Sequence, residues 1–128
     1  MRLRTLVMIS VLAMLVPACD GPTAGELSID LVTPSNSDGA ILFRVETPSS
    51  KDLGQVTPAC SGCDAFSYKV SDSEIYVAVT GALTSGPLAR IVVSDVALSG
   101  LYAVSIVEIA GRDRRLRSDV GYQLRLSR

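Results

Sequence analysis

The sequence contains no histidine and no tryptophan among its 128 residues. Histidine is the commonest general base and the usual partner of serine and cysteine nucleophiles, so its absence argues against the common hydrolytic triads. The chain also has no Gly-rich loop ending in lysine and no Gly-x-Gly-x-x-Gly run, which argues against nucleotide enzymology. We therefore expect a protein that is not an enzyme and that uses no cofactor.

Long apolar runs are scarce, and the clearest one lies at the N-terminus. It covers residues 6–16, is interrupted only by Ser10 and follows Arg2 and Arg4. A helix that crosses a membrane needs about 20 apolar residues, so this run is too short to be one. A positive start followed by a short apolar stretch is typical of an export signal.

The run Val16-Pro17-Ala18-Cys19 closes this segment and resembles the lipobox of bacterial lipoproteins. The resemblance implies cleavage after Ala18, lipidation of Cys19 and attachment to a membrane of the bacterial envelope, with the choice of membrane open. Anchoring by two or more acyl chains is stable. The alternative is an ordinary signal peptide, which would leave Cys19 a free thiol. Residues 1–18 are then the signal, 19–25 a short tether and 26–128 one domain.

Cysteine is also rare, since the chain has only Cys19, Cys60 and Cys63. If Cys19 carries lipid, the other two form one Cys-x-x-Cys pair in an oxidising compartment, where we expect a disulfide that closes a tight turn around Gly62. The alternative is a redox-active thiol pair, which normally sits at a helix N-terminus. A zinc site would need four ligands, so we expect no metal there.

Basic residues are concentrated near the C-terminus. Residues 112–128 hold six arginines, whereas residues 19–128 as a whole carry 10 basic and 13 acidic groups, a net charge of −3. Export makes nucleic acid an improbable partner. The cluster Arg112, Arg114, Arg115 and Arg117 is then either a contact for anionic lipid head groups or envelope polyanions, or a solvated hairpin loop.

The apolar pattern after Glu26 has a period of two rather than 3.6, which indicates strands. We predict seven strands, and we pair the first two as one hairpin and the third and fourth as another. Turn-forming residues such as Ser99-Gly100 separate the segments, and Gly81 ends the fourth strand. The fold class is therefore an all-β, antiparallel sandwich, either immunoglobulin-like or jelly-roll-like. The predicted strands are residues 27–31, 41–45, 66–70, 75–79, 89–96, 102–110 and 122–126.

The stretch from Val77 to Val93 resembles the part of cohesin-type domains in which a strand, a glycine-containing turn and an apolar strand follow one another. The resemblance implies a jelly-roll-like sandwich that docks to a protein or a carbohydrate without catalysis. The favoured hypothesis is therefore a membrane-tethered binding module for an envelope protein or glycan. The alternative is a thiol-disulfide redox protein that uses Cys60 and Cys63.

Carboxylates are the remaining chemical groups of interest. A pair of them can hydrolyse glycosidic bonds, and four lie on or beside predicted strands, although solvent-facing carboxylates are far more common. Acidic loop residues in a sandwich can also bind calcium, but the dense spacing of a dedicated calcium loop is missing. The candidates are Glu46, Glu74, Asp95 and Glu108 for the first chemistry, and Asp38, Asp64 and Asp72 for the second.

Overall fold

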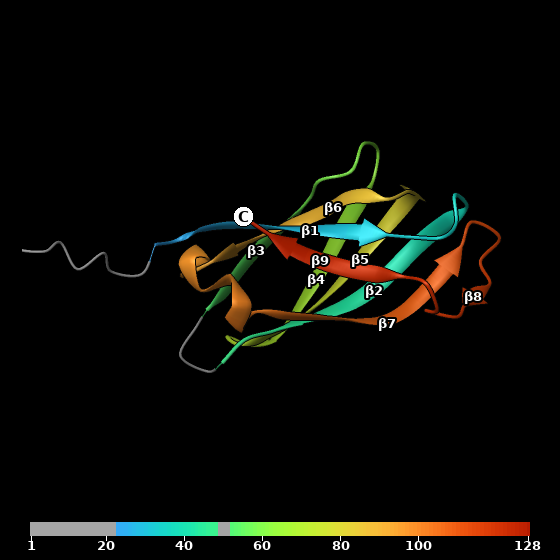
Figure 1. Ribbon diagram of the computed structural model, residues 1–128. Coiled ribbons are helices and arrows are strands. Elements are labelled where there is room, and N and C mark those ends of the chain that lie inside the picture. Colours follow the sequence, from blue (N-terminus) through green and yellow to red (C-terminus); the bar gives the residue numbers. More distant parts are fainter. Residues whose placement is uncertain (1–22, 49–51) are drawn as a thin grey trace, which may run out of the picture.

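The computed structural model describes residues 23–48 and 52–128. Two antiparallel sheets lie face to face with the hydrophobic core between them (Figure 1). The four-stranded sheet has the order β3 (Leu53–Pro58), β6 (Gly86–Val93), β1 (Gly25–Val32) and β9 (Gln123–Ser127). The five-stranded sheet has the order β4 (Asp64–Ser71), β5 (Glu74–Leu83), β2 (Asp38–Glu46), β7 (Ala103–Gly111) and β8 (Leu116–Arg117). The all-β sandwich is thus confirmed.

Alternation of apolar and polar residues builds the core, because successive side chains of a strand point to opposite faces. Phe43 and Val45 of β2, Val77 of β5 and Leu27 and Ile29 of β1 all have no exposed surface. Burying one such side chain contributes about 1.5–3 kcal/mol to folding. These residues fix which face of each strand points inward, and therefore which face remains outside.

The predicted hairpin between the first two strands is wrong. β1 pairs with β6 and β9, whereas β2 lies in the other sheet, between β5 and β7. The connection at residues 33–37 carries the chain across the sandwich. Alternation shows that one face of a strand is buried, but not which strand lies beside it. The second predicted hairpin is confirmed, since β4 pairs with β5 around the turn at residues 71–74.

Two strands escaped the sequence analysis. β3 has the sequence LGQVTP, which contains glycine and proline and little alternation, and it lies at an edge of its sheet, where proline is tolerated. β8 has only two residues and lies inside the arginine-rich run. β5 also continues through Gly81 to Leu83, so this glycine does not end the strand.

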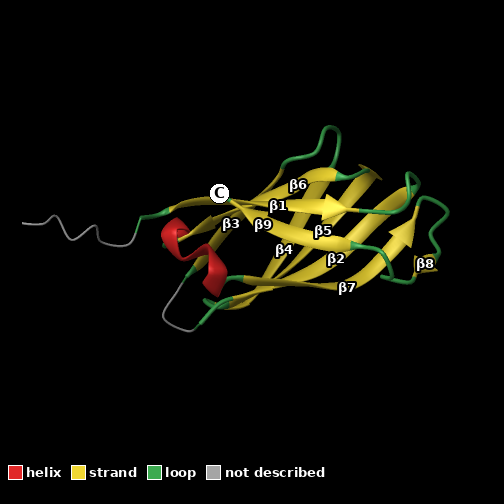
Figure 2. Ribbon diagram, viewed as in Figure 1, coloured by secondary structure: helices red, strands yellow, loops and turns green. Residues whose placement is uncertain are grey.

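The two ends of the sandwich carry different elements of secondary structure (Figure 2). One end carries the 3₁₀ helix η1 (Val96–Leu101), the start of β1 and the C-terminus. The other end carries the connection from β1 to β2 and the β7–β8 turn, which meet where Arg112 N–H donates to the Ser37 carbonyl over 2.9 Å. We call these the η1 end and the distal end.

Candidate functional site

The predicted lipidation and cleavage residues, Cys19 and Ala18, lie outside the described residues. The described chain begins at the η1 end, where the Val96 N–H donates to the Thr23 carbonyl over 2.9 Å. β1 begins two residues later, at Gly25. The chain is therefore held to η1 within four residues of Cys19.

Cys60 and Cys63 form a disulfide with a Cα–Cα distance of 5.6 Å, in the connection between β3 and β4. Cys63 is buried and is followed directly by β4, so the helix that activates redox thiols does not follow this pair. Gly81 of β5 lies beneath the turn with a φ of +144°, and a Cβ atom there would lie 3.1 Å from the Cys63 Cα. The disulfide turn is thus packed onto the distal end of β5.

Arg117 is half-buried, whereas the other three arginines of its cluster are exposed. Its Nη1 donates to Ser35 Oγ over 2.8 Å and its Nη2 to Ser37 Oγ over 2.9 Å. The same Nη1 lies 3.6 Å from Asp38 Oδ1. The guanidinium group of Arg117 is therefore bound to side chains of the protein itself. This distinguishes it from a group that is free to contact an anionic surface, as predicted for the whole cluster.

Asp38 is the buried carboxylate at the centre of this network, with 1% of its surface exposed. Thr33 Oγ1 donates to its Oδ2 over 2.5 Å, and the Tyr122 hydroxyl donates to its Oδ1 over 2.8 Å. With Arg117, these donors come from two segments far apart in sequence, residue 33 and residues 117–122. Because its oxygens are already engaged by these groups, Asp38 serves as a structural anchor rather than a calcium ligand.

The other three arginines lie on the β7–β8 turn, which is held by backbone hydrogen bonds. Gly111 N–H donates to the Arg115 carbonyl over 2.9 Å, and Arg114 N–H donates to the Gly111 carbonyl over 3.0 Å. Arg114 has a φ of 64°, and the Arg112 Nη2 donates to the Asn36 carbonyl over 3.3 Å. The turn therefore presents its guanidinium groups from a fixed backbone.

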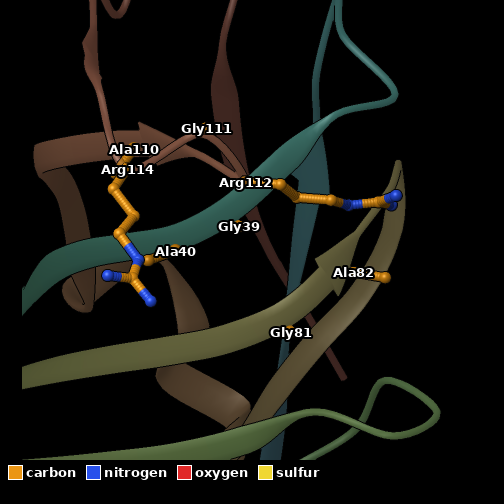
Figure 3. A pocket seen from close by; sticks show the side chains of 8 residues that line it. All are labelled: Gly39, Ala40, Gly81, Ala82, Ala110, Gly111, Arg112 and Arg114. Carbon is orange, nitrogen blue, oxygen red and sulfur yellow. The ribbon is translucent and has the colours of Figure 1, made fainter.

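A depression of about 520 Å³ opens beside this turn on the outer face of the five-stranded sheet. Its floor consists of small residues at the distal ends of three strands, and its rim carries two arginines (Figure 3). In Figure 3 the side chain of Arg114 extends over Ala40, while that of Arg112 extends toward the end of β5 near Ala82. The lining residues are Gly39, Ala40, Gly81, Ala82, Ala110, Gly111, Arg112 and Arg114.

The depression coincides with an irregularity in the sheet. Between Asp38 and Ala40 the register of β2 shifts against both β5 and β7. Such bulges bend a strand and are over-represented beside functional sites. Glycine interruptions in an alternating strand pattern are the sequence signal for a bulge, and Gly39 and Gly81 supply them. Because glycine also marks turns and strand ends, these small residues were not predicted from the sequence as part of a site.

Apolar side chains continue the same outer face toward both of its edges. At one edge, Phe66 and Tyr68 of β4 are 61% and 71% exposed, and at the other, Leu116 of β8 is 71% exposed. A smaller hollow of about 90 Å³ between them is lined by Leu42, Ala78 and Leu116 among others, and shares Ala40 and Ala110 with the depression. The outer face thus combines aromatic, aliphatic and cationic groups.

Two of the predicted carboxylate candidates lie together around one arginine. Glu46 and Glu74 are cross-strand partners, and both face Arg44, whose Nε lies 2.7 Å from Glu46 and whose Nη1 lies 3.8 Å from Glu74. A side-chain hydrogen bond with Tyr76, followed by the charge of Glu46, raises the pKa of Arg44. This cluster is a salt-bridge network at the other end of the sheet from the depression.

The remaining acidic candidates are spread over the molecule. Asp95 caps η1 by accepting from the Ala97 N–H, and Glu108 lies beside Leu42 on the outer face. Asp72 pairs with Lys69 at 3.1 Å, and Asp64 begins β4. Within residues 23–48 and 52–128, no three acidic or cysteine side chains are grouped closely enough to hold a metal ion.

No family model, curated protein or solved structure matches this chain. The likeness to cohesin-type domains therefore stays a prediction. In the described part of the chain, no helix has the length and apolar character needed to span a membrane. The candidate site is the depression with its two arginines, together with the apolar outer face that continues from it.

Proposed function

We propose that this chain is a membrane-tethered lipoprotein of the bacterial envelope whose β-sandwich is a non-catalytic binding module for a protein or a glycan. The observation that carries the binding role is the outer face of the five-stranded sheet, where Phe66, Tyr68 and Leu116 are largely exposed and the depression opens at the distal end. Exposed apolar groups gathered beside polar ones are typical of interaction sites.

The tether part of the proposal is supported by the signal and the Val16-Pro17-Ala18-Cys19 run. It also agrees with the position of the first described residues, since Thr23 is fixed at the η1 end and the depression opens at the distal end. A domain anchored in this way presents its site away from the attachment point.

Crosslinking in intact cells tests the binding role. We expect a reproducible envelope partner, a glycan or a protein, whose capture is lost when Phe66 and Tyr68 are both replaced by serine. The matched control is Val120→Ser, which removes an apolar side chain that is 79% exposed but lies outside the sheet. Equal capture by all variants would contradict a binding role for this face.

A further inference from the structure

We infer that the depression at the distal end binds an anionic polysaccharide, whose carboxylate, phosphate or sulfate groups are held by Arg112 and Arg114. This inference rests on the proposed function, because it specifies the ligand class of the same face. Both arginines line the depression, and among the described residues no acidic one does. Guanidinium groups bind carboxylates and phosphates through paired hydrogen bonds, which makes arginine well suited to such ligands.

The β7–β8 turn fixes the backbone of both arginines, and a hydrogen bond also holds the side chain of Arg112. Arg112 is fixed through its backbone to Ser37 and through its side chain to the Asn36 carbonyl. The guanidinium group of Arg117 packs against Gly111 of the same turn and forms an ion pair with Asp38. A binding group whose support is already ordered loses less conformational entropy when the ligand arrives. The network around Asp38 therefore acts as the support of the site.

The floor of the depression favours a glycan over an acidic peptide. It spans β5, β2 and β7, and β2 is paired with both of the other strands, so these strands lie inside the sheet and not at its edge. A peptide cannot add as a strand there, because strand addition needs a free sheet edge. Small side chains instead let the apolar C–H face of a sugar ring approach the sheet closely, and Phe66 and Tyr68 offer aromatic surface further along the face.

The position of the depression favours an extended polymer over the head groups of the anchoring membrane. Cys19 and Thr23 are four residues apart, so the tether reaches at most about 14 Å. β1 has eight residues and spans about 26 Å from the η1 end toward the distal end. The short tether holds the η1 end near the bilayer and leaves the arginines on the opposite side.

The test measures binding of polygalacturonate, dextran sulfate and neutral dextran to the purified full chain in mild detergent, by affinity electrophoresis. We expect one or both polyanions to bind and neutral dextran to bind at least tenfold more weakly. Arg112→Gln and Arg114→Gln should each weaken polyanion binding about tenfold, as expected for a lost charge-assisted hydrogen bond. The matched control is the pair Arg90→Gln and Arg125→Gln, which removes two positive charges from the four-stranded sheet.

Three outcomes would overturn the inference. If the control pair weakened polyanion binding as much as the variants at Arg112 and Arg114, the attraction would be a diffuse effect of net charge. If neutral dextran bound as well as the polyanions, the site would not recognise anionic groups. Polyglutamate is run in the same electrophoresis as a fourth polymer, and preferential binding of it would assign the site to an acidic protein. In each case the crosslinked partner that depends on Phe66 and Tyr68 would still uphold the proposed function, so the two failures are distinguishable.

Discussion

At the scale of single residues, the buried carboxylate of Asp38 joins β2 to Thr33, Arg117 and Tyr122. Replacing it with alanine leaves these donors without their acceptor, so we expect Asp38→Ala to lower the free energy of unfolding by about 2–4 kcal/mol. Urea denaturation measures the change. Asp72→Ala is the control, because this carboxylate is 76% exposed and its pair with Lys69 should contribute less than about 1 kcal/mol. Similar losses in both variants would contradict the anchoring role of Asp38.

A second residue-scale prediction concerns Gly111, over which the Arg117 guanidinium passes. A Cβ atom at Gly111 would lie 2.5 Å from Arg117 Nη2 and 2.7 Å from Asp113 Oδ1. We expect Gly111→Ala to cost about 1–3 kcal/mol of stability by overpacking, measured by thermal unfolding. The control is Gly100→Ala, since a Cβ atom there meets nothing within 4 Å. If Gly111→Ala lost no more stability than the control, the Arg117 guanidinium would not be held firmly against Gly111.

At the scale of elements, the disulfide turn between β3 and β4 joins the two sheets near the distal end. Its loop is short, so removing the cross-link with a Cys60→Ala and Cys63→Ala double variant should cost about 2 kcal/mol or less. Urea unfolding of the oxidised, reduced and double-variant proteins measures this cost. The reduced protein should remain a folded sandwich in the absence of urea, with nearly the same free energy of unfolding as the double variant.

The reactivity of this disulfide toward dithiols distinguishes a structural role of the cysteines from the redox alternative. A structural disulfide that is stiff and partly buried should resist exchange with a dithiol substrate. Rapid reduction by a dithiol, together with oxidation of a reduced client protein, would instead support catalysis by Cys60 and Cys63.

β4 carries large apolar side chains that are exposed rather than buried. Phe66 and Tyr68 pair with Ala78 and Tyr76 of β5, yet their side chains are largely exposed. Because they bury little surface, we expect Tyr68→Ser to change the free energy of unfolding by less than about 0.5 kcal/mol. Chemical denaturation checks this. A large loss would mean that Tyr68 serves the core rather than a ligand.

At the scale of the whole molecule, the decisive feature is the proposed tether at Cys19. We expect mass spectrometry of the mature chain to show a lipidated cysteine at its N-terminus and no residues before it. A Cys19→Ser variant should lose the lipid and leave the membrane fraction while keeping the all-β circular dichroism spectrum of the domain. An unmodified Cys19 thiol in the native protein would contradict the tether and leave the sandwich unaffected.

The sequence by itself determined the fold class and the inward-facing residues. The alternation of Ile41, Phe43 and Val45 identifies a strand with one buried face, because side chains on a strand repeat every two residues. The same local reasoning identified the hairpin between β4 and β5 and the pairing of Cys60 with Cys63. These features depend on residues close together in the chain, so their signals are local.

Only the tertiary structure decided the partners of β1 and β2 and the makeup of the candidate site. Arg112 and Arg117 are only five residues apart in sequence, yet one lines the depression and the other binds Asp38. Gly39 and Gly81 are 42 residues apart, yet both line its floor. Such assignments depend on the pairing of distant strands, which is set by how two sheets pack their apolar faces together. No local pattern carries that information.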